Sequence, residues 1–251
     1  MLKLTLKNLL ARRVRLLLSA FAIVLGVGFV AGSFVFTDTM ASSFDKIAYG
    51  TVSDVNVRPV SESSDAITGS VNIDSRRIPA SVVDDIRKVE GVKSAVGGIQ
   101  GMGLMVITKE NRLLSTSGAP TLAFNAAETF NTAGESMTTW VKGRAPNKKG
   151  ELGLDARAAA GGGYEIGDTV KLATPGNPPI MKAKLTGILE FNGGGLAGAS
   201  LVVFDTKTAQ QLFLDGEDAF NQVAIQREAD VSQAELAKRV ERVLPEGIEA
   251  I

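Results

Sequence analysis

An uncharged apolar stretch near the start of the chain constrains the architecture more than any other feature. It runs over 21 residues, from Leu16 to Phe36, and contains no Asp, Glu, Lys or Arg. As an α-helix it would be about 31 Å long, which matches the roughly 30 Å hydrocarbon core of a bilayer. The sequence therefore predicts a transmembrane helix over 16–36, preceded by a short segment, 1–15, and followed by a main domain, 37–251.

The charges that flank this stretch predict its orientation. The first 36 residues hold five basic side chains and no acidic one, and Asp38 follows the span. Because basic flanks stay in the cytoplasm, we expect a cytoplasmic N-terminus and an extracytoplasmic main domain. The basic residues of the flank are Lys3, Lys7, Arg12, Arg13 and Arg15.

The segment before the span is amphipathic as well as basic. Over 2–15, leucines share one face of a helix, whereas Lys3 and Lys7 share another. This pattern predicts a basic amphipathic helix on the inner leaflet of the bilayer. The alternative is that the segment only extends the membrane helix inward.

A cleaved signal peptide is the alternative interpretation of the apolar stretch. The apolar part of a signal peptide is usually about 7–15 residues long and ends at a small-x-small site. The stretch here is longer, and residues 37–43 offer only a poor site near Ala41. We therefore expect a retained anchor, and a mature N-terminus near Ser42 would contradict this expectation.

Three glycines within the span predict a surface that packs against another helix. They are Gly26, Gly28 and Gly32, and the last two form a G-x-x-x-G pair. This spacing lets the backbone of a second helix approach closely in lipid. Gly is also frequent in membrane helices in general, which is the alternative explanation.

The composition excludes several kinds of chemistry. The chain has no Cys and no His, so disulfides, Cys nucleophiles, Ser-His-Asp triads and metal sites built on these residues cannot form. After residue 36 there are 22 basic residues against 27 acidic ones. A mildly acidic body argues against a nucleic-acid partner, because phosphate binding needs a basic face. We assign no catalytic residue, no metal ligand and no cofactor.

The main domain alternates strands and helices. Strands are expected at 54–60, 103–109, 151–154, 168–172, 182–189, 200–204, 222–226 and from 248 onward, and helices at 78–89, 155–161, 205–213 and 232–244. Asp155 and Asp205 are expected as N-caps, and Ser232 with Glu235 as a capping box.

This order of elements predicts an α+β fold. Two α/β units, at about 52–109 and 200–251, flank a β-rich middle at about 140–199. Two separated βαβ-like halves that pack together form a split α/β lobe of ferredoxin-like or porter-like type, into which the β-rich lobe is inserted. The pattern stops as the strand from Ile248 begins, so we expect a fragment of a longer protein.

Several polar clusters are interpreted as structural. The glycine runs 161–163 and 193–195 lack the Lys-Ser/Thr of a phosphate loop, so we expect flexible loops and no ATP site. Asp84 and Asp85 diverge by about 100° on a helix and are expected on a solvated face. Four further residues are expected to anchor turns and hydrogen bonds of the β-rich lobe: Arg144, Pro146, Glu151 and Asp168.

Two segments resemble the MacB/FtsX-type ABC transporter permeases. The first is the N-terminal stretch LKNLLARRVRLLLSAFAIVLGVGFVAG, and the second is KGRAPNKKGELGLDARAAA followed by YEIGDTVKL. The residues that carry the resemblance are Asn8, Leu9, Arg12, Arg13, Arg15, Gly26 and Gly28, and then Gly143, Arg144, Pro146, Gly150, Glu151, Ala159, Gly167, Asp168 and Val170.

The resemblance implies a permease subunit in the cell (inner or plasma) membrane, in contact with the lipid bilayer. It implies a dimer of permease chains that works with a separate cytoplasmic ABC ATPase. The work would be transport, extraction of a lipid or lipoprotein, or transmission of motion to the extracytoplasmic side. Family members continue into three further membrane helices, which this sequence does not contain.

Two other functions remain open at the level of the sequence. One is a single-span, membrane-anchored interaction or sensor module without transport activity. The other is an exported hydrolase, for example with a site centred on Ser115, although no motif supports it.

Overall fold

An apolar helix and a mixed α+β unit make up the described part of the chain. The computed structural model describes residues 17–35, 53–60, 77–116, 119–132, 134–174, 179–191 and 198–251. The chain divides into two units, Met1–Asp45 and Lys46–Ile251.

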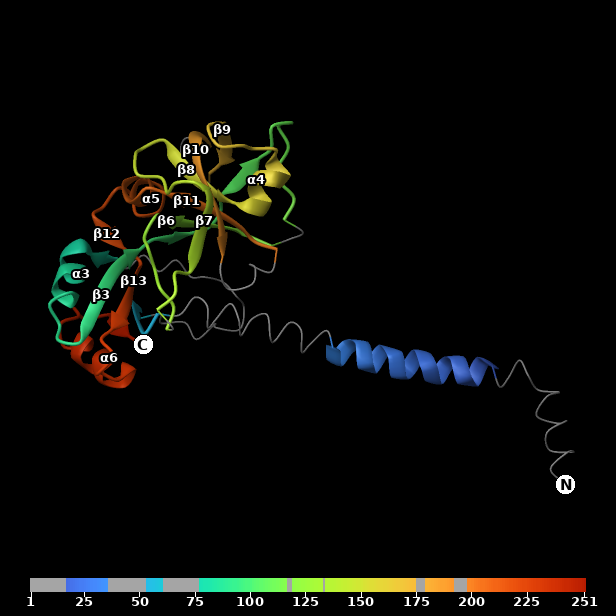
Figure 1. The fold of residues 1–251 in the computed structure, drawn as a ribbon, viewed down its shortest axis with the longest axis horizontal. Coiled ribbons are helices and arrows are strands. Elements are labelled where there is room, and N and C mark those ends of the chain that lie inside the picture. Colours follow the sequence, from blue (N-terminus) through green and yellow to red (C-terminus); the bar gives the residue numbers. More distant parts are fainter. Residues whose placement is uncertain are drawn as a thin grey trace, which may run out of the picture. The chain divides into compact units, whose positions relative to one another are not determined.

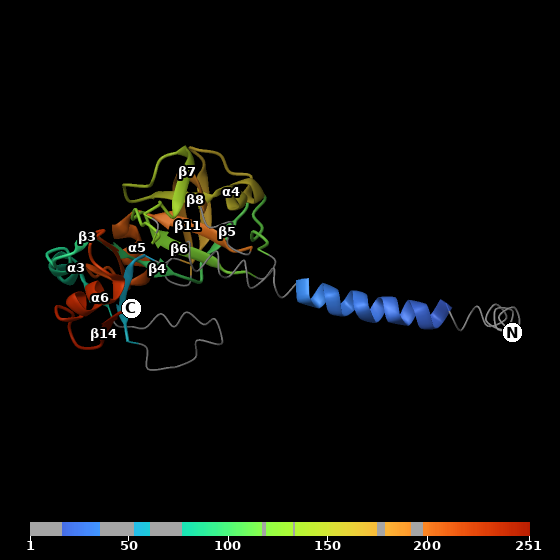
Figure 2. The same ribbon diagram turned by 60° about the horizontal axis from the view of Figure 1, so that its bottom comes forward.

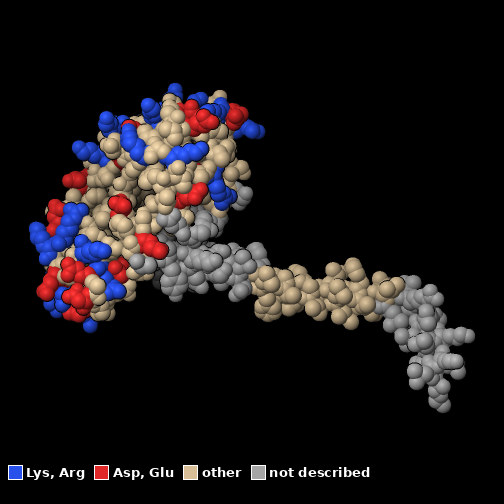
Figure 3. All heavy atoms as spheres, viewed as in Figure 1, with Lys and Arg blue, Asp and Glu red and all other residues tan. Residues whose placement is uncertain are grey.

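The described helix of the first unit, Leu17–Val35, coincides with the predicted span. It has 19 residues, an 18-residue stretch of it has a mean hydropathy of 2.2, and its length and composition suit a membrane crossing. Figure 3 draws it without a charged side chain. The basic segment 1–15 lies outside the described residues.

The second unit contains a four-stranded antiparallel sheet, the small sheet (Figures 1 and 2). Its strands, in spatial order, are β14 (Ile248–Ala250), β1 (Val55–Pro59), β13 (Gln222–Arg227) and β3 (Val92–Gly98). Strands β1 and β3 run parallel on either side of β13 and are joined through α3 (Ala80–Ile86). Strands β13 and β14 flank β1 in the same way and are joined through α6 (Gln233–Glu241). This arrangement is a split βαβ fold, as predicted.

Alternation of side chains explains how the small sheet and its helices pack. In β1, Val55 and Val57 are buried on the face that meets the helices. Val83 of α3 and Leu236 of α6 belong to the same apolar cluster, so both helices cover one face of the sheet. The small sheet with α3 and α6 is called the small lobe below.

The second sheet has eight strands and is inserted between β3 and β13. Along its main path the strands are β4 (Gln100–Gly101), β6 (Thr121–Asn125), β11 (Ser200–Phe204), β8 (Glu151–Asp155), β10 (Ile180–Phe191), β9 (Thr169–Ala173) and β5 (Met105–Ile107), and β7 (Thr138–Gly143) also pairs with β10. This sheet with α4 (Ala156–Gly162) and α5 (Thr206–Phe213) is called the large lobe. It is β-rich and inserted, as predicted, but it extends from β4 to α5 rather than over about 140–199.

Two predicted strands belong to a different sheet from the one expected. The strand at 103–109 was expected to complete the first βαβ half, but β5 pairs with β9 in the large lobe. The strand that completes that half is β3, whose ending in Gly97 and Gly98 interrupts the apolar alternation. Similarly, β11 lies in the large lobe rather than in the second half.

A short two-stranded ladder pairs β2 (Ile78–Pro79) with β12 (Ala219–Phe220).

Three helix caps have the predicted geometry. Asp155 and Asp205 each accept hydrogen bonds from the first-turn N–H groups of their helices. Ser232 accepts a hydrogen bond from the N–H of Glu235, so this half of the expected capping box is present.

Candidate functional site at the start of the first strand

The chain passes from the first unit into the folded domain through β1, which is a central strand of the small sheet. Strand β14 pairs with it on one side and β13 on the other. Beyond the β14 ladder, Asn56 and Ile251 exchange two backbone hydrogen bonds of 2.8 and 2.9 Å. Because these strands are antiparallel, the last residue of the sequence lies beside the first residues of the described domain.

A buried carboxylate fixes the start of β1. The side chain of Asp54 is 6% exposed. It accepts hydrogen bonds from the backbone N–H of Arg227 at 3.0 Å and from the Nε of Arg227 at 3.2 Å. Gln233, the first residue of α6, also donates to it at 3.4 Å. The start of β1 is therefore tied to the end of β13 and to the beginning of α6.

The residues around Asp54 strengthen this clamp. Arg227 uses Nη1 to donate to the carbonyl of Val231 at 3.0 Å, which orients the guanidinium. Ser53, which is buried, donates through Oγ to the Oδ1 of Asn56 at 2.9 Å. We call Ser53, Asp54, Asn56, Arg227 and Gln233 the strand clamp.

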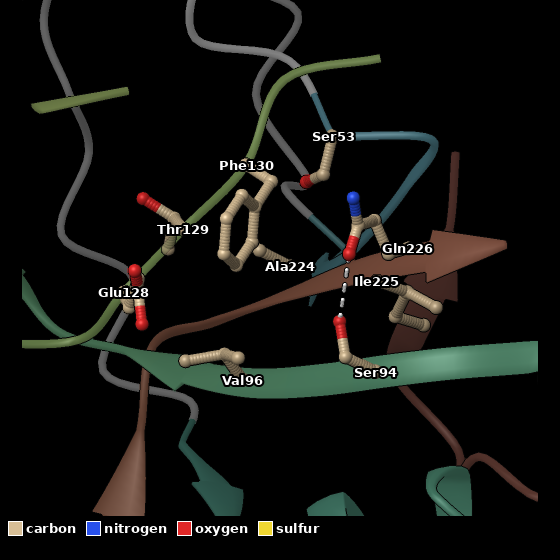
Figure 4. A pocket seen from close by; sticks show the side chains of 9 residues that line it. All are labelled: Ser53, Ser94, Val96, Glu128, Thr129, Phe130, Ala224, Ile225 and Gln226. Carbon is tan, nitrogen blue, oxygen red and sulfur yellow. Dashed lines mark hydrogen bonds between the residues drawn. The ribbon is translucent and has the colours of Figure 1, made fainter. Parts of the chain in front are cut away.

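A small cavity of about 10 Å³ lies next to Ser53, on the sheet face that the helices leave open. Figure 4 shows the side chains around it, with Ser94 donating to Gln226 at 3.3 Å. Its lining residues are Ser53, Ser94, Val96, Glu128, Thr129, Phe130, Ala224, Ile225 and Gln226. This volume suits about one water molecule and excludes an organic ligand.

The large lobe reaches this cavity through the connection between β6 and β7. Residues 128–130 of that connection line the cavity together with Ser53. In Figure 4 the ring of Phe130 lies near Ala224 of β13 and Val96 of β3. The connection is itself pinned by a bridge between Phe130 and Ser136. Both lobes therefore meet at the start of β1.

A buried asparagine joins the two lobes a short distance away. Asn125, at the end of β6, accepts from the N–H of Ile99 at 2.8 Å and donates to the carbonyl of Gly97 at 3.1 Å. Asn221 does the same for Gln100, whose N–H and carbonyl lie at 2.9 and 2.7 Å from its amide. The two amides hold the chain where it crosses from β3 to β4.

Close aromatic packing tightens this junction. The ring of Phe220 lies on Gly97, where an added Cβ would be only 2.5 Å from it. Phe220 also packs against both the small-lobe and the large-lobe apolar clusters. Any side chain at Gly97 would displace the ring, so the junction requires glycine there.

The predicted anchors of the large lobe lie in the positions expected of them. Arg144 donates to both carboxylate oxygens of Glu151, at 2.9 and 2.6 Å. This pairing, with the N–H of Asn147, lowers the pKa of Glu151 to about 2. Asp168 accepts from the N–H of Glu165 at 2.8 Å and pairs with Lys109, which lowers its pKa.

The remaining sequence candidates are placed as follows. Asp84 and Asp85 of α3 are exposed and pair with Arg87 and Lys88, which follow the end of the helix. The glycine run at 161–163 ends α4, with Gly163 in the left-handed conformation. Ser115 is exposed, and the run at 193–195 lies outside the described residues. Within the described part of the chain, no group of three acidic residues could hold a metal ion.

The glycines and basic residues of the membrane segment are still predictions of a packing surface and of orientation. Among described atoms, nothing lies within 4 Å of a Cβ added at Gly26, Gly28 or Gly32. The basic residues of the flank lie outside the described residues.

Sequence reasoning missed the residues that connect the parts of the domain. Asp54 and Arg227 are 173 residues apart along the chain, so no local pattern links them. Asn125 interrupts the strand alternation TLAFN, and a buried polar residue at a strand end was the available signal.

Comparison with known proteins places this geometry in context. The model of the family described as MacB-like periplasmic core domain matches residues 16–243. Among curated proteins, no sequence match was found.

Two solved structures are similar in fold. The extracellular domain of the noncanonic ABC-type transporter YknZ from Gram-positive bacteria superposes with a TM-score of 0.51 at 13% identity, over 78% of this chain and 98% of that one. The periplasmic region of MacB from Actinobacillus actinomycetemcomitans gives a TM-score of 0.51 at 11% identity, over 81% and 89%.

Proposed function

Because the chain belongs to the MacB-like periplasmic core domain family, we propose that it is a permease subunit of an ABC transporter. Leu17–Val35 would anchor it in the cell membrane with the N-terminus in the cytoplasm, and the two lobes would lie outside. Its basic N-terminal flank supports this orientation. A cytoplasmic ABC ATPase would supply the energy, since the chain has no phosphate-loop motif of its own.

The strand clamp is the observation that carries the mechanism. A displacement of the membrane helix reaches the folded domain through the connection that leads into β1. Asp54 holds that point to β13 and α6 at the same time, so the small lobe would move as a rigid body. Shear along β1 is resisted by the ladders on both of its sides.

The large lobe would follow through two contacts. The segment at 128–130 covers the start of β1, and the amides of Asn125 and Asn221 hold the crossing from β3 to β4. Motion would then serve transport, extraction of a lipid or lipoprotein, or mechanical signalling to an extracytoplasmic partner. Two permease chains would associate through the glycines of the membrane helix.

The test uses the full-length protein expressed with its genomic neighbours. We expect a P-loop ATPase to co-purify with it in detergent. Residues 1–251 contain no Cys, so in a full-length protein cleared of any other Cys a single Cys at Thr129 reports on the cavity beside β1. Its rate of maleimide labelling is expected to differ between the ATP-bound and nucleotide-free complexes.

Asp54→Asn is the informative variant and Arg58→Gln its matched control, because both residues tie β1 to a neighbouring strand. Asp54→Asn is expected to retain the ATPase but to lose the nucleotide-dependent difference, whereas Arg58→Gln keeps it. Absence of any ATPase, or a labelling rate that ignores nucleotide in the unaltered complex, would contradict the proposal. The former result would favour a single-span interaction or sensor module.

A further inference from the structure

The outer surface of β5, β9 and β10 exposes an unusual set of apolar side chains. Met105, Ala173 and Ile180 are direct partners across the three strands, so they point to the same side. Met105 is 50% exposed and Ile180 is 53% exposed. In the next row, Ile107 bridges to Leu113, which is 57% exposed. Among the described residues outside the membrane helix, three of the seven exposed large apolar residues lie here.

Three lysines lie on the same surface. Lys171 stands directly opposite Lys182, and Lys184 lies two residues further along β10. Lys171 donates to the Oδ1 of Asn111 at 2.7 Å. Within the described residues no carboxylate lies within ion-pairing distance of any of the three. Like charges placed opposite each other across a ladder are destabilising, so an external counter-charge would stabilise this row.

Two other cations of the large lobe are paired with acids. Lys109 pairs with Asp168 at 2.6 Å, and Arg144 pairs with Glu151 at 2.6 Å. Lys171 and Lys182 face each other with no acid as a ladder partner, whereas Lys184 stands opposite Glu151, which is bound by Arg144. We call this surface, made of Met105, Leu113, Lys171, Ile180, Lys182 and Lys184, the lysine face.

We propose that the lysine face rests on the anionic outer surface of the bilayer in which the helix of the same chain sits. Protein interfaces are enriched in aromatic residues and Arg and depleted in Lys. Lysines beside aliphatic side chains are instead typical of a surface that meets acidic lipid headgroups and places its aliphatic groups at the acyl boundary.

Because the membrane helix tethers the domain to the bilayer, even a weak lipid contact is enough to hold the lysine face on the membrane. The helix and the domain belong to one chain, so docking is intramolecular and occurs at a high effective concentration. Each lysine near an anionic surface strengthens binding by about fivefold, and raised salt screens the effect. The inference rests on the proposed membrane anchorage but not on any transport activity.

The experiment places the full chain in nanodiscs of phosphatidylcholine alone or of equal parts phosphatidylcholine and phosphatidylglycerol. Ile180→Cys carries an environment-sensitive fluorophore, and Val243→Cys in the small lobe carries it as a positional control. We expect a blue shift for the label at 180 in the anionic nanodiscs only, reversed by high salt, and no shift for the label at 243.

The charge variant is K171Q/K182Q/K184Q, and its matched control, K88Q/K93Q/K238Q, removes three lysines from the small lobe. The first is expected to abolish the blue shift and the second to preserve it, with unchanged fluorescence of Trp140 showing that both fold. The proposal would be overturned if the label at 180 had the same emission maximum in both kinds of nanodisc, or if both triple variants lost the blue shift equally.

Two further outcomes also count against it. A blue shift of the label at 180 that occurs in pure phosphatidylcholine, but only in nanodiscs that hold two chains, would assign the surface to contact with a second copy instead. Failure of the chain to enter nanodiscs would refute the anchorage itself, which separates that error from an error about the lysine face.

Discussion

Asp54 accepts hydrogen bonds from both the backbone N–H and the Nε of Arg227, at 3.0 and 3.2 Å, across 173 residues of chain. The carboxylate is almost fully buried, and the guanidinium is one-third exposed. Removing Asp54 would leave Arg227 partly hydrated but without its partner. We expect Asp54→Ala to lower the free energy of unfolding by about 2–3 kcal/mol, measured by urea denaturation with Trp140 fluorescence.

The control for that variant is Arg58→Ala. Arg58 also joins β1 to a neighbouring strand, through Glu249 at 2.9 Å, but both side chains of this pair are solvent-accessible. Its loss is expected to change the free energy of unfolding by less than about 1 kcal/mol. Equal effects of the two substitutions would show that the strand clamp adds nothing beyond a surface ion pair.

The junction between the lobes should be sensitive to Asn125. Asn125→Ala leaves the N–H of Ile99 without its side-chain partner in a buried site. We expect a loss of about 1–3 kcal/mol in unfolding free energy and faster proteolytic cleavage between the lobes. Asn147→Ala, at an exposed turn, is the comparison and should leave both quantities nearly unchanged.

Stability at low pH should depend on the pair of Arg144 and Glu151. The pKa of Glu151 falls from 4.5 to about 2 in the folded protein, chiefly because of Arg144. A lowered pKa means that the contribution is complete above the unfolded value and disappears as pH falls through the folded one. The stability difference between the wild type and Glu151→Gln is therefore expected to be constant at neutral pH and to shrink between about pH 4.5 and pH 2.

Urea midpoints measured across that range provide the check. The comparison variant is Glu110→Gln. Glu110 is an acid of the same lobe whose pKa is also lowered, but with a contact to Thr108 as the largest cause. A difference for Glu151→Gln that stays constant down to pH 2 would show that Arg144 does not hold this carboxylate in its charged form.

Association of the membrane helices should depend on Gly28. Gly28→Leu places a large side chain on the G-x-x-x-G surface and is expected to weaken self-association severalfold in detergent or in a bacterial membrane reporter. Val27→Leu changes size on a different face and should have little effect. An undiminished signal for Gly28→Leu would exclude this surface from the helix contact.

Local patterns predicted the elements whose cause is local. The apolar span, the caps at Asp155, Asp205 and Ser232, and the strands ending near Phe204 and Arg227 follow from residues close in sequence. Because these signals are short-ranged, they identify an element without assigning its sheet. Thus β5 and β11 were found but given to the wrong sheet.

Elements that depend on distant partners could not be predicted from the sequence. Strand β3 contains two glycines and one lysine, and its strand character comes from pairing with β13 more than 120 residues later. Strand β7 is largely exposed, and Trp140 is fixed by lying against Gly153 and Gly187, which belong to two other strands. The residues of the strand clamp were missed for the same reason.

Inserting the large lobe between β3 and β13 also sets the order in which the molecule can assemble. During synthesis, β1 and β3 emerge early, yet both lie beside β13, which is made only after the whole insertion. Until then Val55 and Val57 have no sheet to join, while the large lobe already has most of its core. Synthesis therefore leaves β1 and β3 as unpaired strands while the insertion is made, and unpaired strands favour aggregation or chaperone capture until β13 pairs with both of them.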